Sequence, residues 1–557
     1  MRNLLASLFL TIIVATFAST ASAQWQTNGV PLCTTGGQRY YPVSVSDGSG
    51  GAIVIWVDNR YNNWDIYAQR VNAAGVPQWA ADGVAIGTGP SVFESYIRPA
   101  ITPDGSGGAI VTWSSFYNNG ELTIRAQRVD ASGALQWMPD GVFIGVEWPY
   151  PTSSVIASDH AGGAIITWSD SQSGNRMFAQ RVNAAGVPQW TPGGVALATG
   201  AGEQLSPGIV SDASGGAIVT WTDTRSGTDH DIYAQRVNAS GVPQWAADGV
   251  ALCTTANEQY DPKVASDGAG GAIVTWYDYD IFDIYAQRVN ASGVAQWTTD
   301  GVALCTAAGV QGAPVIVSDG SGGAIVTWHD ARNASSEIYA QRVDAVGSPQ
   351  WIADGVFICT AAWEQDHAIA ILSDDLGGAI VAYFDDPAYN IYAQRVSASG
   401  TLQWTVNGVA LCTAADVQRY PTIALDGSGG AIATWVDHRA FYSRDLYAQR
   451  VLASGTVPTA VARPTTGPSL IVGEIYPNPL TGTALLDVEL TAPSTVRIDV
   501  FDVAGRRVRA MTLRDVVSQR VVFDGRDEKG RSLPSGVYFS RVTANGSVLT
   551  RKMVIAR

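Results

Sequence analysis

Tryptophan and tyrosine stand beside aspartate, asparagine and arginine in several short segments between predicted strands. One is 58–65 (DNRYNNWD) and another is 363–367 (WEQDH). An aromatic ring offers a rigid apolar surface, and the neighbouring polar groups supply hydrogen bonds. Residues of these types on exposed loops suit a glycan or a protein surface, which predicts a ligand-binding module. The candidate binding residues are Tyr41, Arg60, Trp64, Tyr96, Trp148, Asp223, Asp278, Trp363, Asp366, Tyr420 and Arg439.

The same segments supply carboxylates that are candidates for acid–base chemistry. A glycoside hydrolase needs two carboxylates that flank the scissile bond. Six candidates lie in these loops, namely Asp58, Asp223, Asp278, Asp280, Glu364 and Asp366. No pair is distinguishable from the rest, and the five histidines fall at unrelated repeat positions without a serine or cysteine motif. We therefore predict no catalytic residue; an exo-acting glycoside hydrolase and a purely structural surface protein are the alternatives.

A repeated strand pattern must position these segments. The hexad Gly51–Trp56 (GAIVIW) occurs in eight copies, 52 to 57 residues apart. Each copy is apolar almost throughout, as a strand buried on both faces would be. Four strand-like pieces per repeat, separated by turn signals, are typical of a β-propeller blade. The copies end at Trp56, Trp113, Trp168, Trp221, Trp276, Trp328, Tyr383 and Trp435.

The two ends of the repeat region predict closure into a ring. Residues 24–33 read as a fourth strand with no blade before it, and residues 445–451 as a third strand whose fourth strand is missing. Pairing the two pieces would remove two exposed sheet edges. We therefore predict an all-β fold in which residues 24–455 form an eight-bladed β-propeller closed by the N-terminal strand.

The two ends of each blade differ in variability. The turns between strands one and two (DGSGG) and between strands three and four (NASG) are nearly identical from copy to copy. The loops between strands two and three and the links between blades vary, and they hold the aromatic and charged residues named above. Because binding sites are usually built on variable loops of a rigid scaffold, we place the site on the loop side.

Recurring aromatic and arginine residues are better explained by structure than by ligands. Tryptophans at the ends of the second and fourth strands are expected to pack neighbouring blades together. A ring of eight arginines suits an anion, but we expect each guanidinium to pair with Asp47, Asp58 or an equivalent carboxylate. These arginines are Arg70, Arg128, Arg181, Arg236, Arg288, Arg342, Arg395 and Arg450.

The glycine-rich turns and the cysteines also have structural interpretations. Each DGSGG turn offers one carboxylate, so turn chemistry explains it without a metal; we predict no cofactor, with Ca²⁺ as the alternative. The cysteines occupy one repeat position, and copies in neighbouring blades would lie too far apart for a disulfide. We expect them to be small buried side chains. They are Cys33, Cys253, Cys305, Cys359 and Cys412.

Composition bounds the partners and the destination. Residues 1–23 read as a signal peptide, and no later segment is long and apolar enough to span a membrane. Residues 456–472 are a Pro/Thr-rich linker, and residues 473–557 are predicted to form an Ig-like β-sandwich. The net charge is −15, and residues before 473 hold a single lysine, which argues against nucleic acid as a partner.

Two resemblances add to this reading. The pieces 57–60 (VDNR) and 65–67 (DIY) resemble the WD40-like repeats of translocation-protein-type propellers. The segments 500–508 (VFDVAGRRV) and 533–539 (LPSGVYF) resemble the type A sorting domain of type IX secretion cargo and the Ig-like domain of hook-capping proteins. The residues that carry the sorting motif are Tyr476, Pro477, Asn478, Pro479, Gly536, Tyr538 and Lys552.

The second resemblance implies that residues 473–557 engage a secretion machinery and direct passage across an outer membrane. The expected location is therefore the medium or the outer surface of a Gram-negative bacterium. Taken together, the sequence predicts an exported, monomeric β-propeller that binds a glycan or a surface protein through its variable loops.

Overall fold

A computed structural model describes residues 25–88, 98–116, 122–147, 154–170, 174–333, 337–360, 369–385, 388–439, 443–459, 470–472, 475, 479–480, 482–544 and 547–556. All regular secondary structure in these residues is β-strand. The chain divides into two compact units, Met1–Ala460 and Val461–Arg557. None of the described residues belongs to a helix of the length and hydropathy that a membrane crossing requires.

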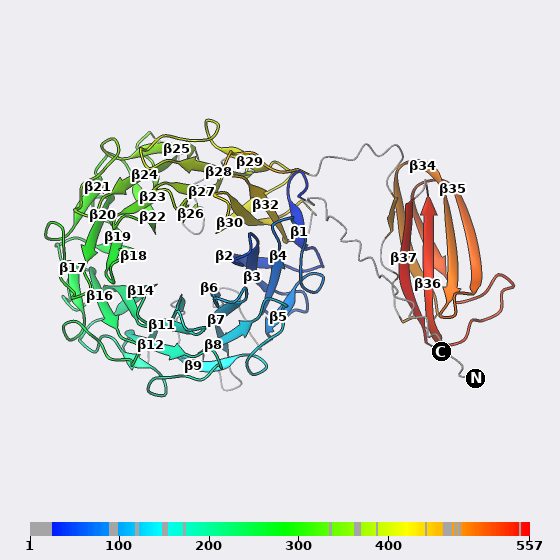
Figure 1. Cartoon of the computed structure of the whole chain (residues 1–557), viewed down its shortest axis with the longest axis horizontal. Coiled ribbons are helices and arrows are strands. Elements are labelled where there is room, and N and C mark those ends of the chain that lie inside the picture. Colours follow the sequence, from blue (N-terminus) through cyan, green and yellow to red (C-terminus); the bar gives the residue numbers. More distant parts are fainter. Residues whose placement is uncertain are drawn as a thin grey trace, which may run out of the picture. The chain divides into compact units, whose positions relative to one another are not determined.

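The repeat region forms four-stranded antiparallel sheets that follow one another around a ring (Figure 1). The first strand of each sheet lies nearest the centre of the ring, as the positions of β2, β18 and β30 show. Seven sheets use four consecutive strands: β2–β5 (Arg39–Ser46, Ala52–Asp58, Asp65–Val71, Val84–Gly87), β6–β9 (Ala100–Pro103, Ala109–Phe116, Leu122–Val129, Val142–Glu147), β10–β13 (Val155–Ser158, Ala164–Asp170, Arg176–Val182, Val195–Ala196), β14–β17 (Gln204–Ser211, Ala217–Asp223, Asp231–Val237, Val250–Cys253), β18–β21 (Gln259–Ser266, Ala272–Asp278, Asp283–Val289, Val302–Cys305), β22–β25 (Gln311–Ser318, Ala324–Asp330, Glu337–Val343, Val356–Thr360) and β26–β29 (Ile369–Ser373, Ala379–Phe384, Ile391–Val396, Val409–Cys412).

The eighth sheet joins the two ends of the repeat region. Its strands β30 (Gln418–Leu425), β31 (Ala431–Asp437) and β32 (Asp445–Val451) pair in chain order. β1 (Val30–Cys33) lies antiparallel to β32 and completes the sheet. The N-terminal segment therefore supplies the fourth strand that the last repeat lacks, as the phase of the termini predicts.

The apolar core lies between neighbouring sheets. All seven residues of β3 are buried. Ile55 and Val57 of β3 share one cluster with Val111 and Trp113 of β7 in the next sheet. The second-strand tryptophans therefore pack sheet against sheet, which confirms the structural role predicted for them.

A polar contact joins each sheet to the next, and we call it the inter-sheet link. In the first copy, Arg70 lies 2.8 Å from the Asp47 carboxylate and donates to the carbonyl oxygen of Ala131 in the following sheet at 3.0 Å. The indole of Trp79 donates to the same carbonyl at 3.1 Å. In the last copy, Arg450 and Trp25 both donate to Ala73 at 3.0 Å, which links the eighth sheet to the first.

The link repeats with little variation. The arginine–aspartate distances span 2.8–2.9 Å, and the indole–carbonyl distances span 3.0–3.2 Å. The expected pairing of the repeated arginines with aspartates is therefore confirmed, and the partners are the Asp47-type carboxylates. The other oxygen of Asp47 accepts from the backbone amides of Ser49 and Gly51 at 2.7 and 2.8 Å. Both oxygens of this turn carboxylate are thus used within the protein.

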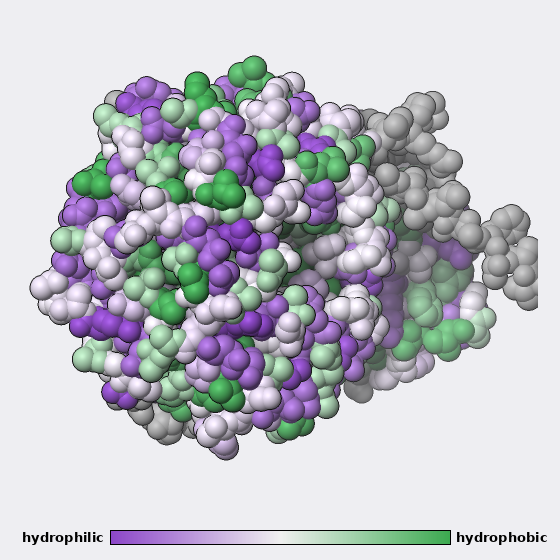
Figure 2. Space-filling view, turned by 60° about the vertical axis from the view of Figure 1, so that its left-hand side comes forward, coloured by the Kyte–Doolittle hydropathy of each residue, from purple (hydrophilic) through white to green (hydrophobic). Residues whose placement is uncertain are grey.

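The five cysteines are free and buried, as expected for small core side chains. Figure 2 shows hydrophobic residues as small separate groups among hydrophilic ones on the side that Figure 1 has on its left. Exposed valines also occur singly at turns between third and fourth strands, as Val242 and Val294 do. Single exposed apolar residues are ordinary on soluble proteins and indicate no interface.

The C-terminal unit has its own core. Its strands are β33 (Leu470–Val472), β34 (Ala484–Asp502), β35 (Arg507–Phe523), β36 (Gly536–Ala544) and β37 (Ser547–Ile555). Hydrogen bonds connect all five strands into one sheet, because the long β34 pairs with β33, β35 and β36. The side chains of Leu486, Ile498, Phe523 and Met553 meet in one buried cluster. The Ig-like arrangement of two facing sheets stays a prediction.

The N-terminal segment that holds Trp25 and β1 should contribute as much to the free energy of unfolding as the same segment of an internal sheet. Trp25 is 1% exposed, and a Cβ added at Gly75 would lie 2.8 Å from its ring. We expect Trp25→Ala to lower the free energy of unfolding by about 3–5 kcal/mol, because it removes a packed indole and its bond to Ala73. Chemical denaturation followed by circular dichroism measures this loss. Trp79→Ala is the matched control and should cost about the same; a neutral Trp25→Ala beside a costly Trp79→Ala would contradict the closure.

Candidate ligand-binding face

The variable loops and the links between sheets lie on the same side of the ring. The backbone amide of Asn59, in the loop after β3, donates to the carbonyl of Gln38 in the link before β2 at 3.1 Å. Thr224 makes the equivalent bond to Glu203 at 3.0 Å, and Tyr279 makes it to Glu258 at 2.8 Å. We call this side the loop face and the opposite side the turn face. The predicted separation of variable and uniform segments is therefore confirmed.

One cluster of aromatic rings and arginines spans three sheets on the loop face. The rings of Tyr40 and Trp64 lie 5.4 Å apart in an edge contact, and Tyr40 lies 6.1 Å from Tyr41. The guanidinium of Arg444 lies 4.1 Å over the Tyr40 ring, and that of Arg98 lies 4.8 Å over the Tyr41 ring. We call these five residues the aromatic–arginine cluster. Tyr40, Tyr41, Trp64 and both arginines are partly exposed.

A strained backbone holds Tyr41 in this cluster. Its φ is +50°, although it is not glycine and it precedes Pro42. A residue before proline is normally extended, so this conformation costs free energy that the surrounding fold must supply. The pairing of β2 with β3 shifts register between Tyr40 and Val43, which marks a β-bulge. Bulges re-aim side chains, and this one leaves two successive tyrosines partly exposed.

The same bulge recurs at four other first strands. In each copy a residue with positive φ stands directly before a proline, and the pairing with the second strand shifts register there. The residues are Ser206, Asp261, Ala313 and Tyr420. Tyr420 is thus placed like Tyr41, and it is half-buried against the packing cluster of the first and last sheets. The bulge is a regular feature of the scaffold, and the side chain at its tip differs from sheet to sheet.

A second group of rings lies around His230. Tyr260 donates to or accepts from His230 Nδ1 at 3.1 Å, and the same nitrogen bonds to Glu258. Tyr260 also contacts Tyr277 and Tyr279, and burial together with the Glu258 charge raises its pKa to about 12. The Tyr260 hydroxyl therefore stays protonated near neutral pH, and it is already used within this group of side chains.

Several charged residues predicted to bind a ligand are instead engaged inside the sheets. Asp223 is fully buried and accepts from the Trp221 indole at 2.7 Å and from Arg225 at 2.5 Å. Arg60 makes the equivalent contact with Asp58 at 2.6 Å and lies 3.8 Å over the Tyr67 ring. These contacts favour a structural role over the expected ligand contact. Arg439 is placed in the same way, with Asp437 at 2.6 Å and Tyr447 at 3.8 Å.

The remaining predicted residues divide into two groups. Asp278 is 4% exposed and accepts from the Asn257 side-chain amide at 2.9 Å. Four others lie outside the described residues, namely Tyr96, Trp148, Trp363 and Asp366. Of the residues predicted from sequence, the structure therefore brings Tyr41 and Trp64 together. The sequence did not predict Tyr40, Arg98, Arg444 or Tyr260 as binding residues. The available signal was a proline close behind Tyr40 and Arg98, namely Pro42 in β2 and Pro99 just before β6.

Some carboxylates lie opposite each other on neighbouring strands, and such a pair is a candidate for acid–base catalysis. Asp58 lies opposite Asp65, and Asp223 lies opposite Asp231. Burial alone would raise the pKa of Asp58, but Arg60 and Arg39 outweigh it and hold that pKa below its usual range. Burial and the nearby Asp58 charge raise the pKa of Asp65 to about 6. One ionised and one protonated carboxyl is what acid–base hydrolysis needs. Asp58, however, is fully buried and is already paired with Arg39, Arg60 and the Trp56 indole, which favours a structural role.

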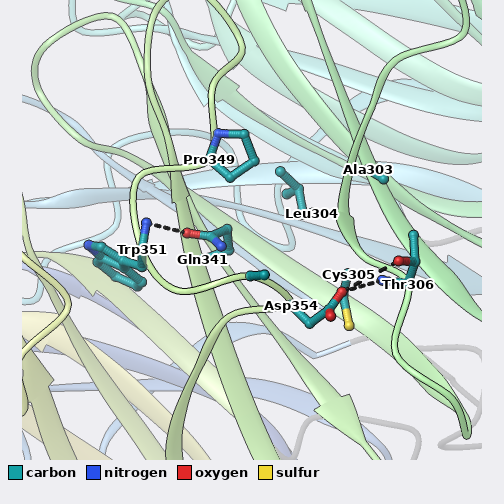
Figure 3. Close-up of a pocket in the computed structure, with 9 residues that line it drawn as sticks. Ala303, Leu304, Cys305, Thr306, Gln341, Pro349, Trp351 and Asp354 are labelled. Atoms are coloured by element: carbon teal, nitrogen blue, oxygen red, sulfur yellow. Dashed lines mark hydrogen bonds between the residues drawn. The ribbon is translucent and has the colours of Figure 1, made fainter.

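A cavity of about 340 Å³ lies between β21 and the segment before β25 (Figure 3). Gln341 Oε1 accepts from the Trp351 amide at 2.9 Å, and Asp354 accepts from the Thr306 amide at 2.8 Å. Equivalent bonds occur in the first sheet, from Trp79 to Gln69. The polar groups of this cavity are thus used in a contact that recurs with the repeat, which favours a seam between sheets over a ligand site. Among the described residues, no group of three or more His, Cys, Asp or Glu side chains is placed to hold a metal ion.

The predicted sorting residues lie at the start and along the last strands of the C-terminal unit. Tyr538 is 6% exposed and donates to the carbonyl of Pro534 at 3.0 Å. Gly536 begins β36, and Lys552 is exposed on β37. Pro479 is exposed just before Leu480, which bridges to Ile555. Tyr476, Pro477 and Asn478 lie outside the described residues.

Residues 474–556 match the family described as the secretion system C-terminal sorting domain. The resemblance predicted from the strand motifs of this segment is therefore confirmed. The domain implies an interaction with the secretion machinery and export of the chain to the cell surface or the medium. No curated protein matches the chain.

Solved structures are similar to the chain at low identity. Puromycin hydrolase is 16% identical with a TM-score of 0.39, and the match covers 70% of this chain and 58% of that one. PorZ, a surface component of the type IX secretion system of Porphyromonas gingivalis, is 9% identical with a TM-score of 0.30 over 94% and 82% of the chains. The α-L-arabinofuranosidase Arb93A of Fusarium graminearum is 12% identical with a TM-score of 0.36 over 68% and 99%. None of these likenesses transfers an activity to this chain.

The raised carboxyl pKa values predict how stability depends on pH. Burial, followed by the charge of Asp223, raises the pKa of Asp231 to about 6 from an ordinary 3.8. The folded state then holds this proton more tightly than the unfolded state, so stability falls as pH rises from about 4 to about 6. We expect Asp231→Asn to stabilise the protein at pH 7 by about 1–3 kcal/mol and to have little effect at pH 4.

Denaturant titrations at both pH values measure this difference. Asp375→Asn is the control, because Asp375 is exposed at a turn and already has positive φ, which asparagine tolerates. A gain for Asp231→Asn that is equal at pH 4 and pH 7 would contradict the assigned proton.

Proposed function

We propose that the chain is an exported, non-enzymatic binding module whose eight sheets form a closed eight-bladed β-propeller. Closure is supported by the pairing of β1 with β32 and by the bonds from Arg450 and Trp25 to Ala73. With these contacts the inter-sheet link is present in eight copies, one at each junction. Export is supplied by the C-terminal sorting domain.

The ligand is a glycan or a protein surface that the aromatic–arginine cluster contacts. The observation that supports this most is the set of partly exposed rings with guanidinium groups stacked on them at 4.1 and 4.8 Å. Such rings add apolar contact area, and guanidinium groups donate well to carboxylates and hydroxyls. The β-bulge at Tyr41 supports the same site, because this copy of the bulge presents two successive tyrosines where other copies present different side chains.

The turn face offers a matched comparison on the same scaffold. Its turns are held by Asp47-type carboxylates and repeat with little change from sheet to sheet. A ligand site that is unique in the ring must therefore be built from loop-face residues. We propose that the loop face binds and that the turn face braces the ring.

A glycan and surface-protein array probed with the full mature chain tests the proposal. We expect binding that Trp64→Ala and Tyr41→Ala each weaken about five- to thirtyfold, because each change removes a stacking surface worth about 1–2 kcal/mol. Leu376→Ala is the control, since this leucine is 74% exposed on a turn between a first and a second strand. It should leave binding unchanged.

Two outcomes would overturn this function. Binding that survives the combined Trp64→Ala and Tyr41→Ala changes would place the site elsewhere. An array without any bound ligand, together with ordered assembly of the protein on its own, would favour a structural surface protein.

A further inference from the structure

Four sheets contain the same internal cation site. An aspartate at the end of the second strand accepts from the tryptophan two residues before it, at 2.7–2.9 Å, and from an arginine two residues after it, at 2.5–2.6 Å. The guanidinium lies 3.8 Å over a third-strand tyrosine in every copy. It also donates to a backbone carbonyl before the fourth strand at 2.7–2.9 Å. The four arginines are Arg60, Arg225, Arg332 and Arg439.

The β18–β21 sheet keeps this site but lacks its arginine. Trp276, Asp278 and Tyr285 occupy the positions of the tryptophan, aspartate and tyrosine, and Asp280 stands where the arginine would be. The carboxylate of Asp280 turns away and accepts from the Glu258 amide at 3.0 Å. The side chains that surround a guanidinium elsewhere are therefore present without one.

The frame of the site is unchanged. Thr254 donates to Asp300 at 2.9 Å, as Thr34 donates to Asp82 at 2.8 Å in the first sheet. A Cβ added at Gly301 would lie 2.8 Å from Trp276, close to the 2.6 Å found for Gly83 and Trp56. The carbonyl of Asp300 should therefore stand where the Asp82 carbonyl receives its arginine. Cys253 occupies the place of Cys33, which lies 3.2 Å from Arg60.

Two observations show that no cation from the part of the chain that the structure describes takes the place of the missing arginine. The indole nitrogen of Trp276 is fully buried and, among the described residues, has no hydrogen-bond partner. Asp278 accepts from the Asn257 amide at 2.9 Å and from two backbone amides, all of them neutral donors. Asp283 lies opposite Asp278 on the next strand, so a second carboxyl adds to the negative charge.

The site lies where an outside group can reach it. The four arginines that fill the equivalent places have side chains 8%, 22%, 18% and 24% exposed, so each guanidinium stands near the surface. Tyr285 is only partly buried, and one face of its ring stacks on Trp276 at 6.3 Å. In the four filled sheets an arginine covers the ring of the equivalent tyrosine.

We infer that Trp276, Asp278, Tyr285 and the Asp300 carbonyl form a binding site for a guanidinium group brought by a ligand, such as an arginine side chain of a partner. A planar guanidinium satisfies the carboxylate, the carbonyl and the ring face together, whereas an ammonium cannot make this set of contacts. The site is on the loop face, but it stands on its own contacts and does not rest on the aromatic–arginine cluster.

Calorimetric titration of the full mature chain with agmatine at 0.15 M salt tests the inference. We expect one site per chain, weakened at least tenfold by Asp278→Asn and by Asp280→Arg. The second variant copies the arginine of four other sheets, so it should fold, and its thermal midpoint should not fall. Arg225→Ala supplies the converse test, because it empties the equivalent site and should add a second agmatine site.

Further arms identify the source and the chemistry. If the natural group is a protein side chain, a capped peptide with one arginine should bind as agmatine does. If the natural group is a small guanidino compound, agmatine should bind and the peptide should not. A matched lysine peptide should bind at least tenfold more weakly than the arginine peptide. Equal binding of the lysine peptide, equal agmatine affinity of wild type and Asp280→Arg, or no agmatine binding by the wild type would each overturn the inference. Loss of glycan or protein binding in Trp64→Ala would leave this result unaffected.

Discussion

The structure depends on one contact that is repeated at every junction between sheets. An arginine of the third strand holds an aspartate of its own sheet and donates to an alanine carbonyl of the next sheet, where a tryptophan indole donates as well. The carbonyl thus receives two donors. Each partly buried arginine also forms an ion pair with its aspartate, with nitrogen–oxygen distances of 2.8–2.9 Å. Apolar packing between sheets is not directional. The charged hydrogen bonds of this contact are strong and directional, so they fix how one sheet is placed against the next.

This contact explains why the two faces of the ring differ. It uses the turns between first and second and between third and fourth strands, so changes in those turns would break a junction. The loops on the opposite side carry no such requirement, and their residues differ from sheet to sheet. The Trp–Asp–Arg–Tyr site beneath the loops is an intermediate case, because it stabilises four sheets and is absent or incomplete in the others. Where the arginine of this structural site is replaced, as by Asp280 in the β18–β21 sheet, the remaining residues can bind a guanidinium group of a ligand.

The sequence predicted the repeated strands, the contribution of Trp25 to the last sheet and the separation of the two faces, because each depends on periodic patterns. It did not decide whether Arg70 pairs with Asp47 or Asp58, since both are acidic residues at strand ends. It also placed Asp223 and Arg60 at the surface, because pairing between residues two apart around a turn leaves no periodic signal. Trp64 and Tyr41 were found from residue type alone. Their partners Arg98 and Arg444 come from neighbouring sheets, and only the folded ring shows that they meet.

The proposed closure of the ring by the N-terminal strand supports the assignment of both faces, and backbone hydrogen exchange tests this closure most directly. If β1 is a permanent member of the eighth sheet, the amides of residues 30–33 that bond to β32 should be protected to the same degree as those of β5 or β21. Exchange of these amides at the rate of an unstructured peptide, with the other sheets protected, would contradict the closed ring.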